Sequence, residues 1–201
     1  MMGDQPKDAA GALSKRQQKT RTAFMNALVR LVMQHGYDAV TVTDIAEEAN
    51  YGRWTFYQYF DSKADAALAV FEGWMMRVDQ FVVQAVAGLP SPRREYESWR
   101  ILFSAFDAQR AFLMRLDSLT VSAWRVRAKD FLIEQFVGHL EAGNFALMPG
   151  VRPEIAARLY VAAVLDLLEY WGAHPELGDT ETVLNEFYTF IFNQPPPAAD
   201  I

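Results

Sequence analysis

Two unusually short helical segments follow each other near the amino terminus, at residues 41–49 and about 53–60. Three residues, Asn50, Tyr51 and Gly52, separate them. Helices shorter than about 12 residues are marginal in water, so neither segment is stable by itself. Both must therefore pack against the longer helical segment that precedes them, and the three form one small unit.

A three-helix unit with a tight turn before its last helix is a helix-turn-helix, whose last helix enters the major groove of DNA. At 100° per residue, Phe56 and Phe60 lie on one side of the last helix and Trp54 lies on the other. An isolated Trp usually packs against a neighbouring element. Here no acid stands between Glu48 and Asp61. The residues around Trp54 are instead hydrogen-bond donors, which suit phosphate oxygens and base edges: Arg53, Thr55, Tyr57, Gln58, Tyr59 and Lys63.

Helical spacing of apolar residues continues along the chain between clusters of glycine and proline. The pairs Ser14 with Gln17, Thr41 with Asp44 and Ser62 with Asp65 have the spacing of capping boxes. Ser91 before Pro92 is typical of a cap followed by proline at the first helical position. The run V-T-V-T at 40–43 leads straight into an amphipathic segment, so it is interpreted as a helix cap rather than a strand.

The predicted fold is all-α, with about nine helices. A long fourth helix, from 62 to about 87, joins the helix-turn-helix head to a helical bundle, and further helices are expected at 119–142, 153–172 and 180–193. The predicted domains are a DNA-binding domain at 1–63, with 1–13 disordered, a regulatory and dimerisation domain at 64–194, and a proline-rich tail at 195–201.

The charge is distributed unevenly between these parts. The chain has a net charge of −6, but residues 1–63 carry +1 and residues 64–201 carry −7. No acid lies between Asp8 and Asp38, and that stretch has five basic residues: Lys15, Arg16, Lys19, Arg21 and Arg30. A polyanion responds to this local field rather than to the total charge. The alternative is an ordinary solvated helix face.

Composition and motifs exclude several other classes. A chain with 51% hydrophobic residues is not predominantly disordered, and zero cysteines exclude disulfides and thiolate chemistry. His35, His139 and His174 are isolated, and no hydrolase, phosphate-loop, dinucleotide or metal motif is present. We therefore expect neither an enzyme nor a cofactor. Neither a secretory signal nor a membrane-spanning run is visible, which favours the cytoplasm.

Residues 36–63, G-Y-D-A-V-T-V-T-D-I-A-E-E-A-N-Y-G-R-W-T-F-Y-Q-Y-F-D-S-K, resemble the amino-terminal domain of TetR-type transcriptional regulators. The resemblance covers about a quarter of the chain, from Arg21 to Lys63. The residues that match the family pattern are Gly36, Tyr37, Thr41, Ile45, Ala46, Thr55, Phe56, Tyr57, Tyr59, Phe60, Ser62 and Lys63.

The resemblance implies roles for individual side chains. Thr41 or Thr43, Tyr57, Tyr59 and Lys63 are expected at phosphates, and Arg53, Trp54 and Thr55 near bases, with Gln58 beside them. Three positions depart from the pattern. Asn50 stands where Gly is usual, but Asn tolerates a left-handed backbone, and Gly52 replaces a Ser cap at a cost of a few tenths of a kcal/mol. Trp54 replaces a small residue, so it either contacts a thymine methyl or changes the docking depth.

The resemblance also implies that the acidic second domain dimerises and encloses a small-molecule pocket. The segment 153–172 is apolar nearly all round, which indicates a second subunit as its partner. We expect a homodimer through the last two helices, bound to a palindromic operator. Its ligand is expected to be hydrophobic or aromatic. The candidate lining residues are Trp99, Phe103, Phe106, Phe112, Trp124, Phe131, Asp166 and Tyr170.

Other interpretations of the second domain stay open. Any single aromatic residue at helical spacing more often fills a core than lines a site. Asp166 and Glu169 either face a cationic ligand or pair with Arg158 across the interface. The predicted function is a ligand-responsive repressor, released from DNA by its effector. The alternatives are a soluble helical carrier of hydrophobic ligands and a TetR-like activator.

Overall fold

The computed structural model describes residues 13–116, 122–145 and 149–198, with the backbone alone at 122–124. Within these ranges it contains helices and no strands, as predicted. The expected disordered segment falls largely on residues 1–12, outside the described part. The elements are α1 Lys15–His35, α2 Val42–Glu48, α3 Arg53–Tyr57, α4 Lys63–Ala85, α5 Arg93–Leu116, α6 Ser122–Glu141, α7 Pro153–Ala173, a short 3-10 helix Pro175–Leu177 and α8 Thr180–Phe192.

Side-chain caps fix where the first helices begin. The capping boxes of Ser14 with Gln17 and of Thr41 with Asp44 are both complete. The third is half formed: the Ser62 hydroxyl accepts from the Asp65 backbone N–H, while the Asp65 carboxylate accepts from the backbone N–H of Asp61 instead of Ser62. Each cap satisfies N–H groups that the first helical turn leaves without partners.

Two predicted boundaries were wrong by a few residues. α5 begins at Arg93, so Pro92 lies just before the helix and not at its first position. α3 ends at Tyr57 and not at 60, because the backbone N–H groups of Gln58 and Tyr59 bond to carbonyls three residues earlier, which tightens the last turn.

The two short helices are held by α1, as their length requires. The ring of Phe24 in α1 contacts Phe56 of α3 edge to face at 5.4 Å and Tyr51 of the turn at 5.3 Å. Phe24, Ile45 and Phe56 are fully buried in one cluster. The marginal stability of α2 and α3 is thus supplemented by burial of apolar area on α1.

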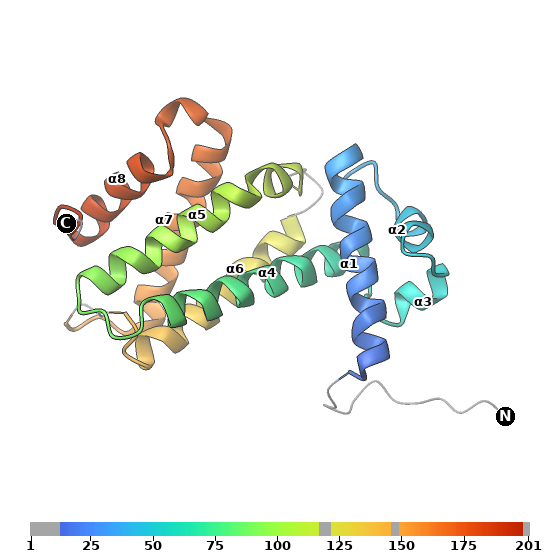
Figure 1. Cartoon of the computed structure of the whole chain (residues 1–201), viewed down its shortest axis with the longest axis horizontal. Helices are drawn as coiled ribbons and strands as arrows, with labels where there is room; N and C mark the ends of the chain where they lie inside the picture. Colours follow the sequence, from blue (N-terminus) through green and yellow to red (C-terminus); the bar gives the residue numbers. More distant parts are fainter. Residues whose placement is uncertain (1–12, 117–121, 146–148, 199–201) are drawn as a thin grey trace.

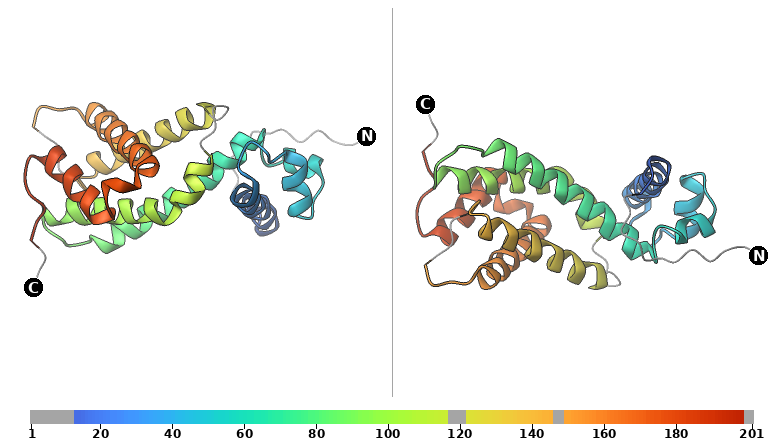
Figure 2. Two further views of the ribbon diagram at one scale, coloured as in Figure 1. Left: turned by 90° about the horizontal axis from the view of Figure 1, so that it is seen from above. Right: turned by 90° about the horizontal axis from the view of Figure 1, so that it is seen from below.

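The molecule is elongated, with α1–α3 at one end and α5–α8 at the other, and α4 runs between them (Figures 1 and 2). The hydrophobic core of the head continues into the body, since Phe112 and Leu116 of α5 belong to the same cluster as Phe24. A second cluster, around Trp99, Trp171 and Tyr188, fills the space between α5, α6, α7 and α8. In the described part of the chain, no helix is both long and apolar enough to span a membrane.

Candidate functional site

The turn before α3 is rigidly built. Asn50 adopts a left-handed backbone with φ of 60°, as its side chain allows, and the backbone N–H of Tyr51 reaches back to the carbonyl of Ala46 at 2.9 Å. The Tyr51 hydroxyl accepts from the Thr20 hydroxyl at 3.3 Å. These bonds set the angle at which α3 leaves the turn.

The outer face of α3 is exposed and rich in donors. Trp54 has 74% of its surface exposed and Tyr57 has 44%, while Phe56 and Phe60 on the opposite side are buried. Arg53 and Gln58 are exposed as well. Within the described residues the Arg53 guanidinium has no hydrogen bond or ion pair. Trp54 is therefore a surface residue of the head and not part of its core.

The predicted threonine and tyrosine contacts divide into two groups. Thr41 is exposed, but its hydroxyl donates to Asp44 Oδ2 at 2.7 Å and accepts from the Asp44 backbone N–H. The Thr41 hydroxyl and N–H hold the pKa of Asp44 below its usual range. Thr43, Thr55 and Tyr59 are half-buried, with the Tyr59 ring 6.1 Å from that of Phe24. Only part of each of these three side chains is therefore accessible from solvent.

Lys63 is placed differently from the expectation of a free phosphate contact. Its ammonium donates to the carbonyls of Tyr37 at 2.7 Å and Val40 at 2.6 Å, and it lies 4.1 Å from the Tyr37 ring centroid. Burial lowers the pKa of Lys63, opposed by the nearby carboxylates of Asp38 and Asp44. A phosphate contact would have to compete with both carbonyls.

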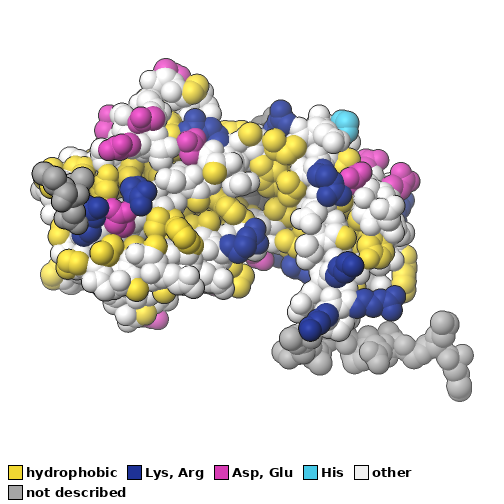
Figure 3. All heavy atoms as spheres, viewed as in Figure 1, with side chains coloured by type: hydrophobic (Ala, Val, Ile, Leu, Met, Phe, Trp, Pro, Cys, Tyr) yellow, Lys and Arg dark blue, Asp and Glu magenta, His cyan; other side chains and the backbone are white. Residues whose placement is uncertain are grey.

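Other basic side chains of the head are exposed. Lys15, Arg16 and Lys19 lie on the first turns of α1, which carry no acid. Lys and Arg side chains gather at the end of the head that also carries α3 (dark blue, Figure 3). Arg30, further along α1, is paired with Glu48 at 2.7 Å. Exposed cations of α1 thus lie at the end of the head that also carries α3.

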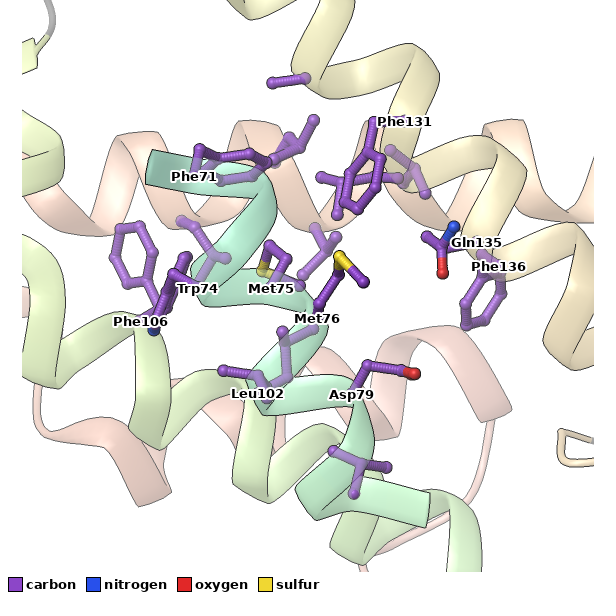
Figure 4. Close-up of a pocket in the computed structure, with 18 of the residues that line it drawn as sticks. Phe71, Trp74, Met75, Met76, Asp79, Leu102, Phe106, Phe131, Gln135 and Phe136 are labelled. Atoms are coloured by element: carbon purple, nitrogen blue, oxygen red, sulfur yellow. The ribbon is translucent and has the colours of Figure 1, made fainter. Parts of the chain in front are cut away.

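A second candidate site is an apolar cavity of about 230 Å³ in the body. α4 supplies one wall with Phe71, Trp74, Met75 and Met76, and α5, α6 and α7 supply the others (Figure 4). Of the predicted lining residues, Trp99, Phe106 and Phe131 are in this wall. All four helices add wall residues that were not predicted, and those of α4 lie where apolar residues repeat at helical spacing from Phe71 to Val82.

The other predicted lining residues lie elsewhere. Phe103 is fully buried in the core, and Phe112 is buried in the cluster shared with the head. Asp166 is exposed on α7, and Tyr170 is 52% exposed and stacks on His174 at 4.1 Å. The side chain of Trp124 lies outside the described residues. Helical periodicity in one sequence does not say which apolar stripe faces a core and which faces a cavity.

Two polar contacts join side chains of the cavity wall to each other, whereas the buried Nε1 of Trp99 in the same wall has no hydrogen-bond partner in the described part of the chain. His139 Nε2 lies 2.5 Å from Asp79 Oδ1, and Asn144 Nδ2 lies 3.1 Å from His139 Nδ1. Glu169 of α7 is paired with Arg125 of α6 within the same chain. His139, isolated in the sequence, is therefore joined to α4 by the fold.

The last two long helices leave apolar side chains uncovered. Leu159 is 66% exposed and Ile155 42% on α7, and Phe190 is 83% exposed on α8. The opposite face of α7 is buried through Ala157, Val161 and Val164 and related residues. α7 thus has one stripe in the core of its own chain and another at the surface.

Comparison with known proteins agrees with this architecture. Residues 24–70 match the family model of bacterial regulatory proteins of the tetR family. An uncharacterised HTH-type transcriptional regulator from the lacX 3' region of Lactococcus lactis is 38% identical over 53 residues, which is 26% of this chain and 27% of the relative. The uncharacterised HTH-type regulator YwcC of Bacillus subtilis is 29% identical over 98 residues, 45% of this chain and 44% of that protein. The chain thus matches less than half the length of either relative.

Solved structures of similar fold cover most of the chain. A candidate TetR-family regulator from Syntrophomonas wolfei has a TM-score of 0.68 at 19% identity, covering 86% of this chain and 93% of its own. NalD, the secondary repressor of the MexAB-OprM multidrug efflux pump in Pseudomonas aeruginosa, has a TM-score of 0.59 at 22% identity, covering 90% and 97%. A SmeT–triclosan complex has a TM-score of 0.57 at 18% identity, covering 85% and 90%. Residues 24–70 thus match the amino-terminal domain of the tetR family of bacterial regulatory proteins, and the chain shares the overall fold of these solved structures.

Proposed function

We propose that this protein is a ligand-responsive transcriptional repressor that binds a palindromic operator as a homodimer and is released by a small hydrophobic or aromatic molecule. The observation that carries the proposal is the outer face of α3. It presents Arg53, Trp54 and Gln58 to solvent beside the exposed cations of α1. With 74% of its surface exposed, Trp54 adds little apolar burial to the head, and DNA contact gives this exposed side chain a role.

In the proposed complex α3 enters the major groove. Arg53, Trp54 and Thr55 meet base edges, with Gln58 beside them, and Tyr57 and Tyr59 meet phosphates. Thr41 and Thr43, in the cap and first turn of α2, approach the phosphate backbone. The Arg53 guanidinium can bond to a guanine through two N–H groups, and the Trp54 indole can contact a thymine methyl.

The proposed dimer buries the exposed apolar side chains of α7 and α8. These are Ile155 and Leu159 on α7 and Phe190 on α8; such a surface is costly to leave in water and fits a second copy of itself. The proposal requires a two-fold pairing there that puts both heads on the same side of the dimer. The recognition helices would then lie about 34 Å apart, one turn of DNA.

The proposed effector occupies the cavity, and α4 connects it to DNA binding. α4 begins under the head at Lys63 and lines the cavity from Phe71 to Val82. A ligand that displaces this helix also moves the head, and so changes the spacing of the two recognition helices. A protein of similar fold, SmeT, has been solved as a complex with triclosan, which supports a ligand-binding role for this fold.

Repression is the simpler outcome of such binding, because a bound dimer excludes polymerase from the DNA it covers. NalD, which shares the fold, is named as a repressor. The experiment that tests the proposal is selection of genomic fragments by the purified full chain, followed by sequencing. We expect enrichment of fragments that share an inverted repeat near a promoter. Recovery of fragments in proportion to the genome would contradict DNA recognition and favour a helical carrier of ligands.

A further inference from the structure

An open groove lies between α4 and α5 on the surface of the body. Its volume is about 480 Å³, within the range of roughly 300–1,000 Å³ for pockets that hold small molecules. None of its described lining residues is acidic, and Val78 is the one that it shares with the apolar cavity. The residues that line it include Arg77, Val78 and Phe81 of α4 and Arg100, Ile101 and Ser104 of α5.

The two arginines of the groove come from facing turns. α4 and α5 run antiparallel and are joined by the loop 86–92 (Figure 1). Arg77 lies eight residues before the end of α4 at Ala85, and Arg100 lies seven residues after the start of α5 at Arg93. At about 1.5 Å per residue, they stand about 12 and 10 Å from the two helix ends that the loop joins. Arg77 and Arg100 therefore lie at nearly the same level on opposite sides of the groove.

Positive charge beside the groove exceeds negative charge. The Glu97 carboxylate binds both Arg93, at 2.9 Å, and Arg100, at 2.6 Å. The Arg77 guanidinium is exposed and has no hydrogen bond or ion pair with a residue that the structure describes. Three guanidiniums against one carboxylate leave two positive charges here, although residues 64–201 together carry −7. The local field therefore attracts an anion from solution.

Apolar side chains lie beside the arginines in the same groove. Phe81 is 59% exposed and stands one helical turn after Arg77, on the same face of α4. Val78 and Ile101 are less exposed and also line the groove. An inorganic anion would leave these apolar surfaces in water, whereas the ring or alkyl chain of an organic anion would cover them.

We infer that this groove is a second binding site, for a small organic carboxylate with an aromatic or aliphatic body. The carboxylate accepts two parallel N–H bonds from Arg77, and the body of the ligand lies against Phe81. Arg100 binds Glu97 through Nε, which leaves its Nη groups for the same carboxylate. A molecule bound here joins α5 to α4, the helix that connects the head with the body. The site is separate from the effector cavity proposed above.

A single introduced thiol tests whether the groove is occupied. The chain has no cysteine, so Ser104→Cys places one thiol in the groove, and Gln109→Cys places one on α5 outside the groove and the cavity. We expect saturating 2-naphthylacetate to slow alkylation of Ser104→Cys by iodoacetamide at least about threefold and to leave Gln109→Cys unchanged. The neutral analogue 2-naphthylethanol should protect neither thiol. No protection by the carboxylate, or equal protection by the alcohol, would overturn the inference.

Charge variants identify the arginine responsible. Arg77→Gln, added to Ser104→Cys, should raise the concentration of 2-naphthylacetate that gives half protection about two- to fivefold. Lys129→Gln removes the same charge from an exposed residue of α6 and should not. Equal shifts in both variants would contradict the role of Arg77, and protection by inorganic phosphate alone would contradict the need for an apolar body. Alkylation is measured without DNA, so its outcome is independent of DNA recognition.

Discussion

The ammonium of Lys63, in the first turn of α4, donates a 2.7 Å hydrogen bond to the backbone carbonyl of Tyr37, in the loop that follows α1. A second bond of 2.6 Å goes to the carbonyl of Val40, just before the cap of α2. One side chain thus ties the helix that lines the cavity to the loop that positions α2. In this structure the Lys63 ammonium binds two backbone carbonyls of the head. The family resemblance implies a different role for it, a contact with a DNA phosphate.

Lys63→Met should therefore destabilise the protein. The variant keeps the apolar stem but removes a charged donor from two carbonyls, so we expect a loss of about 1–3 kcal/mol in the free energy of unfolding. Urea denaturation followed by circular dichroism measures this loss. Lys15→Met, on an exposed residue at the start of α1, is the matched control and should change stability by less than about 0.5 kcal/mol.

The same variants distinguish the two roles of Lys63. A phosphate contact contributes about 0.9 to the slope of log affinity against log salt. We expect Lys63→Met to leave this slope unchanged. A slope reduced by one contact with unfolding unaffected would show that the ammonium leaves its carbonyls for DNA.

Arg53→Ala should weaken specific DNA binding more than non-specific binding. A guanidinium that bonds to a base through two N–H groups contributes about 1–3 kcal/mol of discrimination, or roughly 5-fold to 150-fold in affinity. Competition titrations with selected and scrambled duplexes measure both losses. Arg158→Ala, which removes the same charge from the body, should alter neither. Equal weakening on both duplexes would remove Arg53 from base recognition.

Thr41→Val should raise the pKa of Asp44. In the folded protein the Thr41 hydroxyl and N–H stabilise the carboxylate, so its pKa lies below that in the unfolded chain. This difference stabilises the folded protein at pH values above the pKa of Asp44 in the unfolded chain, and the stabilisation is lost as the pH falls through the pKa of Asp44 in the folded protein. The variant should lose part of this stabilisation. An NMR titration of the carboxyl carbons measures the shift. Asp179, capped separately by Thr182, should keep its low pKa in this variant. An unchanged Asp44 pKa would disprove the role of the hydroxyl.

Leu159→Lys should give a folded monomer. The side chain is 66% exposed in the isolated chain, so the substitution costs little there but places two charges in the proposed interface. Sedimentation velocity at micromolar concentration should show the parent as a dimer and the variant as a monomer. Phe81→Lys changes an equally apolar, 59% exposed residue of α4 and should remain dimeric. A parent that sediments as a monomer would contradict the interface outright.

Local chemistry made the head predictable. Capping pairs such as Thr41 with Asp44 act over three residues, and the opposed faces of Phe56 and Trp54 follow from helix geometry. The left-handed backbone at Asn50 followed from its short polar side chain. The hydrogen bonds of Lys63 within the head were not predicted, because the two carbonyls that accept them lie 26 and 23 residues away in the sequence.

The cavity was predicted less well, for a physical reason. Trp74 and Phe103 both follow helical periodicity, but their surroundings depend on how α4, α5 and α7 cross. Phe103 is fully buried between helices, whereas Trp74 lines a gap between them. The pairing of His139 with Asp79 likewise joins residues 60 positions apart. The periodic spacing of apolar residues in one sequence does not predict how helices pack against one another.

DNA affinity as a function of salt tests the central claim most directly. Fluorescence anisotropy of the purified full chain would compare a duplex from the promoter region next to its own gene with a scrambled duplex of equal length. We expect tighter binding to the promoter duplex by about 10³-fold or more near physiological salt, with affinity falling steeply as salt rises. Equal and weak binding to both duplexes, even at low ionic strength, would contradict the account.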